Sequence, residues 1–83
     1  MSDVRVYGAD WCEDTVVTRE QLDALGIPYD YVDVDADEQA EAWIKQQNHG
    51  KRNTPTVDIG GQILIEPDED ELEGALRAKG LMS

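Results

Sequence analysis

The chain has 83 residues, enough for one small domain, and we expect residues 1–83 to form a single domain and a monomer. Nineteen acidic against seven basic side chains give a net charge of −12, which argues against nucleic-acid and anionic-membrane partners, since both need clustered Lys and Arg. No apolar stretch approaches the roughly 18–20 residues of a membrane span, and the first residues do not resemble a signal peptide. We therefore expect a cytoplasmic protein.

The first predicted element is a strand over Asp3–Gly8, in which apolar residues cluster and a glycine ends the run. A helix over about Trp11–Leu25 follows, and Gly26 ends it. We expect the apolar side of this helix to face the core. That side includes Val17, Leu22 and Leu25.

A second strand is predicted over Tyr29–Val34, which is rich in aromatic and β-branched residues. Apolar residues then recur at spacings of three and four from about Ala36 to Gln47, which indicates an amphipathic helix.

Two short strands, Thr56–Ile59 and Gln62–Ile65, are joined by Gly60-Gly61, a typical two-residue hairpin turn. The last helix begins near Asp68 and is capped by Gly80. Its expected inward residues are Leu72, Ala75 and Leu76.

The predicted helix starts share an Asp-x-x-Glu pattern that resembles a capping box, at Asp10, Asp35 and Asp68. Much of the acidity is then structural, because it places negative charge on the positive ends of helices. The element order is β-α-β-α-β-β-α. A right-handed crossover makes the first two strands parallel, and the hairpin adds an antiparallel pair. The sequence therefore predicts an α/β fold: a four-stranded mixed sheet with three helices covering both faces.

Cys12 is the one cysteine of the chain, which excludes an internal disulfide and a Cys-only zinc site, and we predict no metal site. It falls where the first strand hands over to the first helix. The unpaired N–H groups of a first helical turn favour a thiolate over a thiol, and the thiolate is the nucleophile in thiol–disulfide exchange. The other interpretation is a buried, inert cysteine.

Two segments of the sequence together resemble the glutaredoxins, a family with the thioredoxin-like fold. Tyr7–Thr15 is similar to the glutaredoxin active-site segment, and Asn53–Val57 is similar to the family's Val-Pro or Thr-Pro loop. Element order and loop spacing match over almost the whole chain.

The resemblance implies site residues on three further segments. It implies that Thr54-Pro55 is a cis peptide facing Cys12, with the Thr54 backbone open to a bound peptide or glutathione. It implies that Lys51 and Arg52 border the same groove and hold a carboxylate of glutathione, although both also suit solvated loop charges. Asp68 matches the acidic residue that receives the γ-glutamyl end, a role compatible with capping the helix.

The chain also departs from the family pattern. Thr15 stands in place of the second active-site cysteine, which leaves only a monothiol route with glutathione or another low-molecular-weight thiol as co-substrate and no tightly bound cofactor. Thr15 is expected to stabilise the thiolate by a hydrogen bond. Because Asp10, Glu13 and Asp14 lie close to Cys12 in sequence, we expect their charges to hold the pKa of the Cys12 thiol near or above that of a free thiol.

Three functions fit these residues. The first is a monothiol oxidoreductase acting on mixed disulfides. The second is a redox-inactive binding or adaptor module, which the acidic neighbours of Cys12 and the absent second cysteine would suit. The third is a glutathione-dependent iron–sulfur carrier, which the missing Cys-Gly-Phe-Ser run disfavours.

Overall fold

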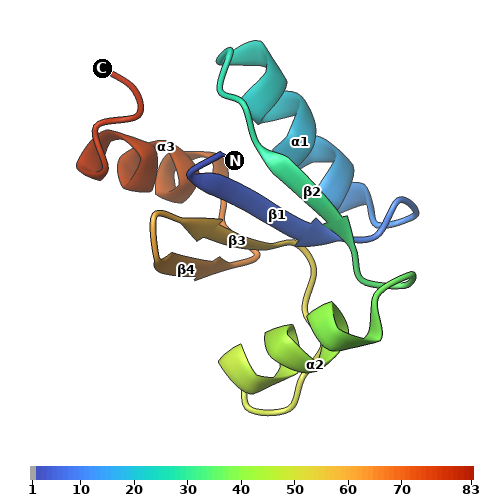
Figure 1. The fold of residues 1–83 in the computed structure, drawn as a ribbon. Helices are drawn as coiled ribbons and strands as arrows, with labels where there is room; N and C mark the ends of the chain where they lie inside the picture. The colour runs from blue at the N-terminus through green and yellow to red at the C-terminus, as the bar shows by residue number, and fades with distance from the viewer. Residues whose placement is uncertain (1) are drawn as a thin grey trace.

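The computed structural model describes residues 2–83, which form a four-stranded sheet flanked by three helices (Figure 1). The elements confirm the predicted order. They are β1 (Val4–Gly8), α1 (Glu13–Ala24), β2 (Asp30–Asp33), α2 (Glu38–Gln47), β3 (Thr56–Ile59), β4 (Gln62–Ile65) and α3 (Glu69–Ala78). No helix within residues 2–83 is long and apolar enough to cross a membrane.

The sheet has the strand order β2-β1-β3-β4 and is mixed, as predicted. β1 pairs in parallel with β2 and antiparallel with β3, which pairs antiparallel with β4. Gly60 and Gly61 connect β3 to β4 with φ angles of 55° and 97°, which are conformations that glycine adopts without strain. The predicted hairpin is therefore confirmed.

Side chains alternate between the two faces of the sheet, and each face packs against its own helices (Figure 1). Val6 points into the larger cluster, where Leu22 of α1 and Leu72 of α3 are fully buried. The next residue, Tyr7, points to the other face and packs with Ile44 of α2. The junction between β1 and α1 therefore follows a central strand whose two faces are both covered by helices.

Only one of the three expected capping boxes forms. Asp68 caps α3: its side chain accepts from the N–H of Glu71 at 2.8 Å, and the Glu71 carboxylate accepts from the N–H of Asp68 at 3.2 Å. The expectations for the other two helices are wrong. The N-cap of α2 is Asp37 rather than Asp35, and α1 begins after Cys12, whose side chain makes no capping bond.

The inward face of α1 also differs from the prediction. Val17 is 57% exposed and Leu25 is 36% exposed, whereas Thr15 and Thr18 are buried with Leu22. These buried positions follow the spacing of three and four that a helix face requires. Because two residues of the buried face are threonines, the pattern of apolar residues did not identify that face. The expected inward orientation of Val17 and Leu25 is therefore wrong.

Candidate functional site

Cys12 is held at the amino end of α1 by its backbone. Its N–H donates to the carbonyl of Ala9 at 3.0 Å, which closes the turn after β1, and its own carbonyl accepts from Val16 at 3.1 Å, which starts the helix. The side chain is half-buried and makes no capping bond. The free N–H groups of the first helical turn therefore face the sulfur rather than a polar cap.

The loop before β3 lies against this sulfur. The Thr54–Pro55 peptide bond is cis, as the resemblance implies, and the Cys12 thiol donates to the carbonyl oxygen of Thr54 at 3.6 Å. Pro55 is fully buried beneath the site. The thiol and the proline loop, 42 residues apart, thus face one another.

Thr15 reaches the sulfur from the first turn of α1, where it is completely buried. Its hydroxyl oxygen accepts from the N–H of Ala9 at 3.4 Å. The hydroxyl proton can therefore be donated in a hydrogen bond to the Cys12 sulfur. Thr15 packs directly on the backbone of Gly8: a Cβ at Gly8 would lie 2.4 Å from the Thr15 methyl group and 2.6 Å from its oxygen. The glycine that ends β1 is needed for this close approach.

The pKa of the Cys12 thiol is lowered. Partial burial raises it, but hydrogen bonds from the side chains of Thr15 and Thr54 and from the N–H groups of Thr15 and Asp14 together outweigh burial. The expected pKa at or above that of a free thiol is therefore wrong in direction. The carboxylate of Asp10 has partners of its own, since it accepts from the Tyr31 hydroxyl at 2.8 Å and lies 3.7 Å from the Arg19 cation. The side chains of Glu13 and Asp14 are exposed, so water screens them.

A second network joins the Cys12 loop to the loop before β3. The indole N–H of Trp11 donates to one oxygen of Asp35 at 2.6 Å, and Arg52 pairs with the other oxygen. Arg52 also pairs with Glu41 of α2 at 3.2 Å. The guanidinium, with the indole as a weaker donor, lowers the pKa of Asp35. Asp35 is therefore an ion-pair partner rather than a helix cap.

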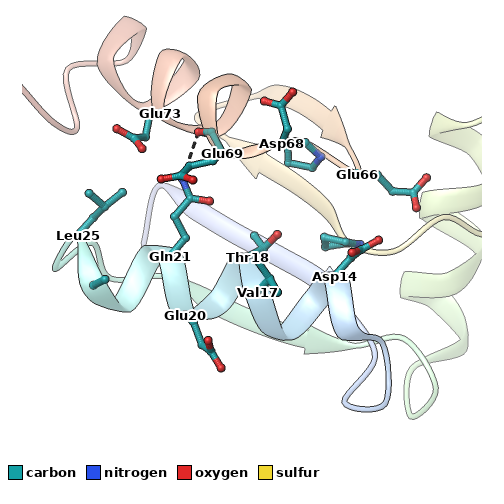
Figure 2. Close-up of a pocket in the computed structure, with 13 residues that line it drawn as sticks. Asp14, Val17, Thr18, Glu20, Gln21, Leu25, Glu66, Asp68, Glu69 and Glu73 are labelled. Carbon is teal, nitrogen blue, oxygen red and sulfur yellow. Dashed lines mark hydrogen bonds between the residues drawn. The ribbon is translucent and has the colours of Figure 1, made fainter.

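A groove of about 580 Å³ runs from the site between α1 and the start of α3 (Figure 2). The amide of Gln21 bridges the two helices by donating to the carbonyl of Glu69 at 3.1 Å. The apolar lining consists of Val17, Ala24, Leu25, Pro55 and Pro67. The charged lining consists of Asp14, Glu20, Glu66, Asp68, Glu69 and Glu73, with no Lys or Arg among the lining residues. This charge favours cations over anions along the groove.

Comparisons with known proteins agree with this geometry. The family model described as Glutaredoxin matches residues 4–64. The chain belongs to the glutaredoxin family. It is 46% identical over 57 residues to Mycoredoxin 1 of Corynebacterium glutamicum, covering 69% of this chain and 70% of the relative. A glutaredoxin of Mycobacterium tuberculosis is 32% identical over 72 residues, 86% of each chain. The crystal structure of a buckwheat glutaredoxin–glutathione complex aligns with a TM-score of 0.76 at 22% identity, covering 99% of this chain and 83% of that one.

The structure brings most of the predicted glutaredoxin site together. Cys12, Thr15, Thr54 and Pro55 form one contact cluster, and Asp68 lines the groove that leaves it while also capping α3. Lys51 lies on the same loop, with an exposed side chain that makes no ion pair within residues 2–83. Arg52 borders the site but is already paired with two carboxylates.

Sequence reasoning missed several residues around this glutaredoxin site. Val17 lines the groove instead of the core, and Glu41 holds Arg52. Glu66 has a φ of 48°, and its carboxylate accepts from the Asn53 amide at 2.9 Å. Nothing in the sequence paired Glu66 with Asn53, which lies 13 residues away. No three His, Cys, Asp or Glu side chains of residues 2–83 group into a metal site.

Proposed function

We propose that this glutaredoxin-family protein is a monothiol thiol–disulfide oxidoreductase that acts on mixed disulfides formed with glutathione or a similar small thiol. The observation that carries the proposal is the Cys12 thiol at the amino end of α1, with a lowered pKa and the Thr54 carbonyl opposite. A low pKa at a partly exposed position is the environment of a reactive cysteine rather than an inert one.

The reaction proceeds in two exchanges. The Cys12 thiolate attacks the small-thiol sulfur of a protein mixed disulfide, and the protein leaves as a thiolate that takes up a proton. Cys12 now carries the small thiol as a mixed disulfide. A second small-thiol anion attacks that carried sulfur, which releases a small-molecule disulfide and restores the Cys12 thiolate. Over the two exchanges, one free small thiol is oxidised as it enters the small-molecule disulfide, and the mixed disulfide on the protein is reduced to a protein thiol.

The surrounding residues have separate roles in this proposal. Thr15 stabilises Cys12 as a thiolate, both as the attacking group and as the leaving group of the second exchange. The backbone of Thr54 beside Pro55 receives the carried thiol in extended form. Asp68, at the far part of the groove, and the open cation of Lys51 suit the charged ends of that thiol.

The absence of a second cysteine supports the monothiol route, since Cys12 is the one cysteine of the sequence. We propose that residues 1–83 act as a single domain and as a monomer. A cytoplasmic location suits this chemistry, because the cytoplasm keeps thiols reduced.

A coupled assay tests the proposal. Reduction of a small-thiol mixed disulfide is followed with glutathione and with an uncharged thiol such as 2-mercaptoethanol, in each case for the wild type and Cys12→Ser. We expect turnover with at least one thiol that Cys12→Ser abolishes. No turnover with either thiol, in a protein whose circular dichroism shows an intact fold, would contradict the proposal and favour the redox-inactive binding module.

A further inference from the structure

Arg52 is a cation on the loop before Thr54, and two carboxylates already pair with it. It lies two residues before Thr54, which contacts the sulfur. It also shares the carboxylate of Asp35 with the indole of Trp11, the residue before Cys12. Arg52 is therefore tied to both loops that flank the reactive thiol.

Two carboxylates from separate elements hold this guanidinium. Asp35 approaches from the β2–α2 loop, and Glu41 approaches from α2 at 3.2 Å. Lys45 completes the group by pairing with Glu41 at 3.1 Å. The four side chains carry two positive and two negative charges, and the carboxylate of Asp33 also acts on Arg52, so this group of side chains presents no net positive charge. A carboxylate of an incoming thiol must therefore compete with Asp35 and Glu41 for the guanidinium of Arg52.

The other arginine that reaches the Cys12 loop is also engaged. Arg19 stacks over the Tyr31 ring at 3.8 Å, donates to the Tyr29 hydroxyl at 3.2 Å and lies 3.7 Å from Asp10. The groove that leaves the site has carboxylates and no Lys or Arg among its lining residues. An anionic thiol thus meets Lys51 as the unpaired cation on the loop before Thr54.

We propose that Asp35 and Glu41 are specificity-determining residues, which withhold Arg52 from the carboxylates of the small thiol and so disfavour anionic thiols in the second exchange. This inference rests on the proposed function, because it concerns the thiol that releases the mixed disulfide on Cys12. The preference for uncharged thiols then comes from the ion pairs of Arg52 with Asp35 and Glu41 rather than from the shape of the groove.

The test compares glutathione with its diethyl ester, which has the same thiol but no free carboxylate. Wild type and variants are loaded with 2-mercaptoethanol on Cys12, and the second-order rate constant for its release is measured with each thiol. The variants are Asp35→Asn, Glu41→Gln and the double variant, which keep side-chain size and remove charge. The matched control is Glu38→Gln, which removes one charge from an exposed position of α2 that makes no ion pair within residues 2–83.

We expect the wild type to react faster with the ester, and the double variant to raise the glutathione-to-ester rate ratio about fivefold, as one freed ion-pairing site would give. Glu38→Gln should change that ratio less than about twofold, as a solvent-screened charge that does not pair with Arg52 would. Adding Arg52→Gln to the double variant should remove the gain. An unchanged ratio in the double variant, an equal gain in Glu38→Gln, or a gain that survives Arg52→Gln would overturn the inference. No release by either thiol from the wild type would instead contradict the proposed function.

Discussion

Replacing Thr15 by Val tests how the low pKa of Cys12 arises. Valine keeps the shape of threonine and removes the hydroxyl that both accepts from Ala9 and stabilises the thiolate. A hydrogen bond to a charged group contributes about 1.5–3 kcal/mol, and one pKa unit corresponds to about 1.4 kcal/mol. Because Cys12 is only half-buried, water replaces part of the lost bond, so the lower end applies. We expect the pKa of Cys12 to rise by about one unit.

The effect on rate is smaller than the effect on the thiolate population. A one-unit rise lowers the thiolate fraction about tenfold at pH values below the pKa. The remaining thiolate is more nucleophilic, with a Brønsted coefficient of about 0.4–0.5, so exchange should slow only about three- to fourfold. Ala9 also loses its acceptor in a buried position. The bond is long at 3.4 Å, so we expect a loss near 1 kcal/mol of unfolding free energy, the lower end for an unsatisfied donor.

The assay is the pH dependence of Cys12 alkylation by iodoacetamide, an uncharged reagent that the local carboxylates do not repel. Thr15→Ser is the matched control, because it keeps the hydroxyl and loses only a methyl group. Its midpoint should stay close to that of the wild type. A Thr15→Val midpoint equal to the wild type, in a protein that still unfolds cooperatively in urea, would refute the role of this hydroxyl.

Three further predictions concern the same site. Gly8→Ala should cost about 1–3 kcal/mol of unfolding free energy in urea, because the new Cβ lies 2.4 Å from the Thr15 methyl group; a change below about 0.5 kcal/mol would show that the site adapts. Burial, followed by the hydrogen bond to Asp10, raises the pKa of Tyr31 to about 12. In Asp10→Asn, Tyr31 should therefore titrate at lower pH when phenolate absorbance is followed. An unchanged midpoint would show that Asp10 does not raise the pKa of Tyr31. Because the pKa of Cys12 is lowered in the folded state, that state binds fewer protons than the unfolded state. The unfolding free energy of the wild type relative to Cys12→Ser should therefore rise with pH up to about 8.5, the pKa of an unfolded thiol. A difference that stays flat or falls with pH in urea titrations would contradict the lowered pKa.

Local signals predicted the fold well. The Gly60-Gly61 turn sits between two β-rich runs, and both glycines have the positive φ that the turn needs. Asp68 and Glu71 lie three residues apart at a helix start and form the predicted box. In each case the residues that give the pattern are the residues that make the contact, so the sequence contains the whole interaction.

The same capping pattern failed where tertiary contacts compete. Asp35 has the spacing of a cap, yet it pairs with Arg52, 17 residues away, and accepts from Trp11. An ion pair with a guanidinium across two loops outweighs a bond to one helix N–H, and sequence spacing does not show which partner comes within reach. The pairing of Glu41 with Arg52 was unpredictable for the same reason.

The pKa of Cys12 shows why proximity in sequence is a poor guide to electrostatics. Counting Asp10, Glu13 and Asp14 as near neighbours predicted a raised pKa. The structure directs Asp10 toward Tyr31 and leaves the other two carboxylates in water, whereas Thr15 and backbone N–H groups point at the sulfur. Directed hydrogen bonds at contact distance therefore outweigh solvent-screened charges.

The central claim is that the Cys12 sulfur attacks a mixed disulfide and carries the small thiol. A single-turnover experiment measures this directly: the reduced protein is mixed with one equivalent of a peptide carrying a small-thiol mixed disulfide, quenched with acid and weighed by intact mass spectrometry. The account predicts that the protein gains the mass of the small thiol on Cys12 while the peptide appears as a free thiol. Recovery of the unmodified protein with the peptide disulfide intact would contradict it.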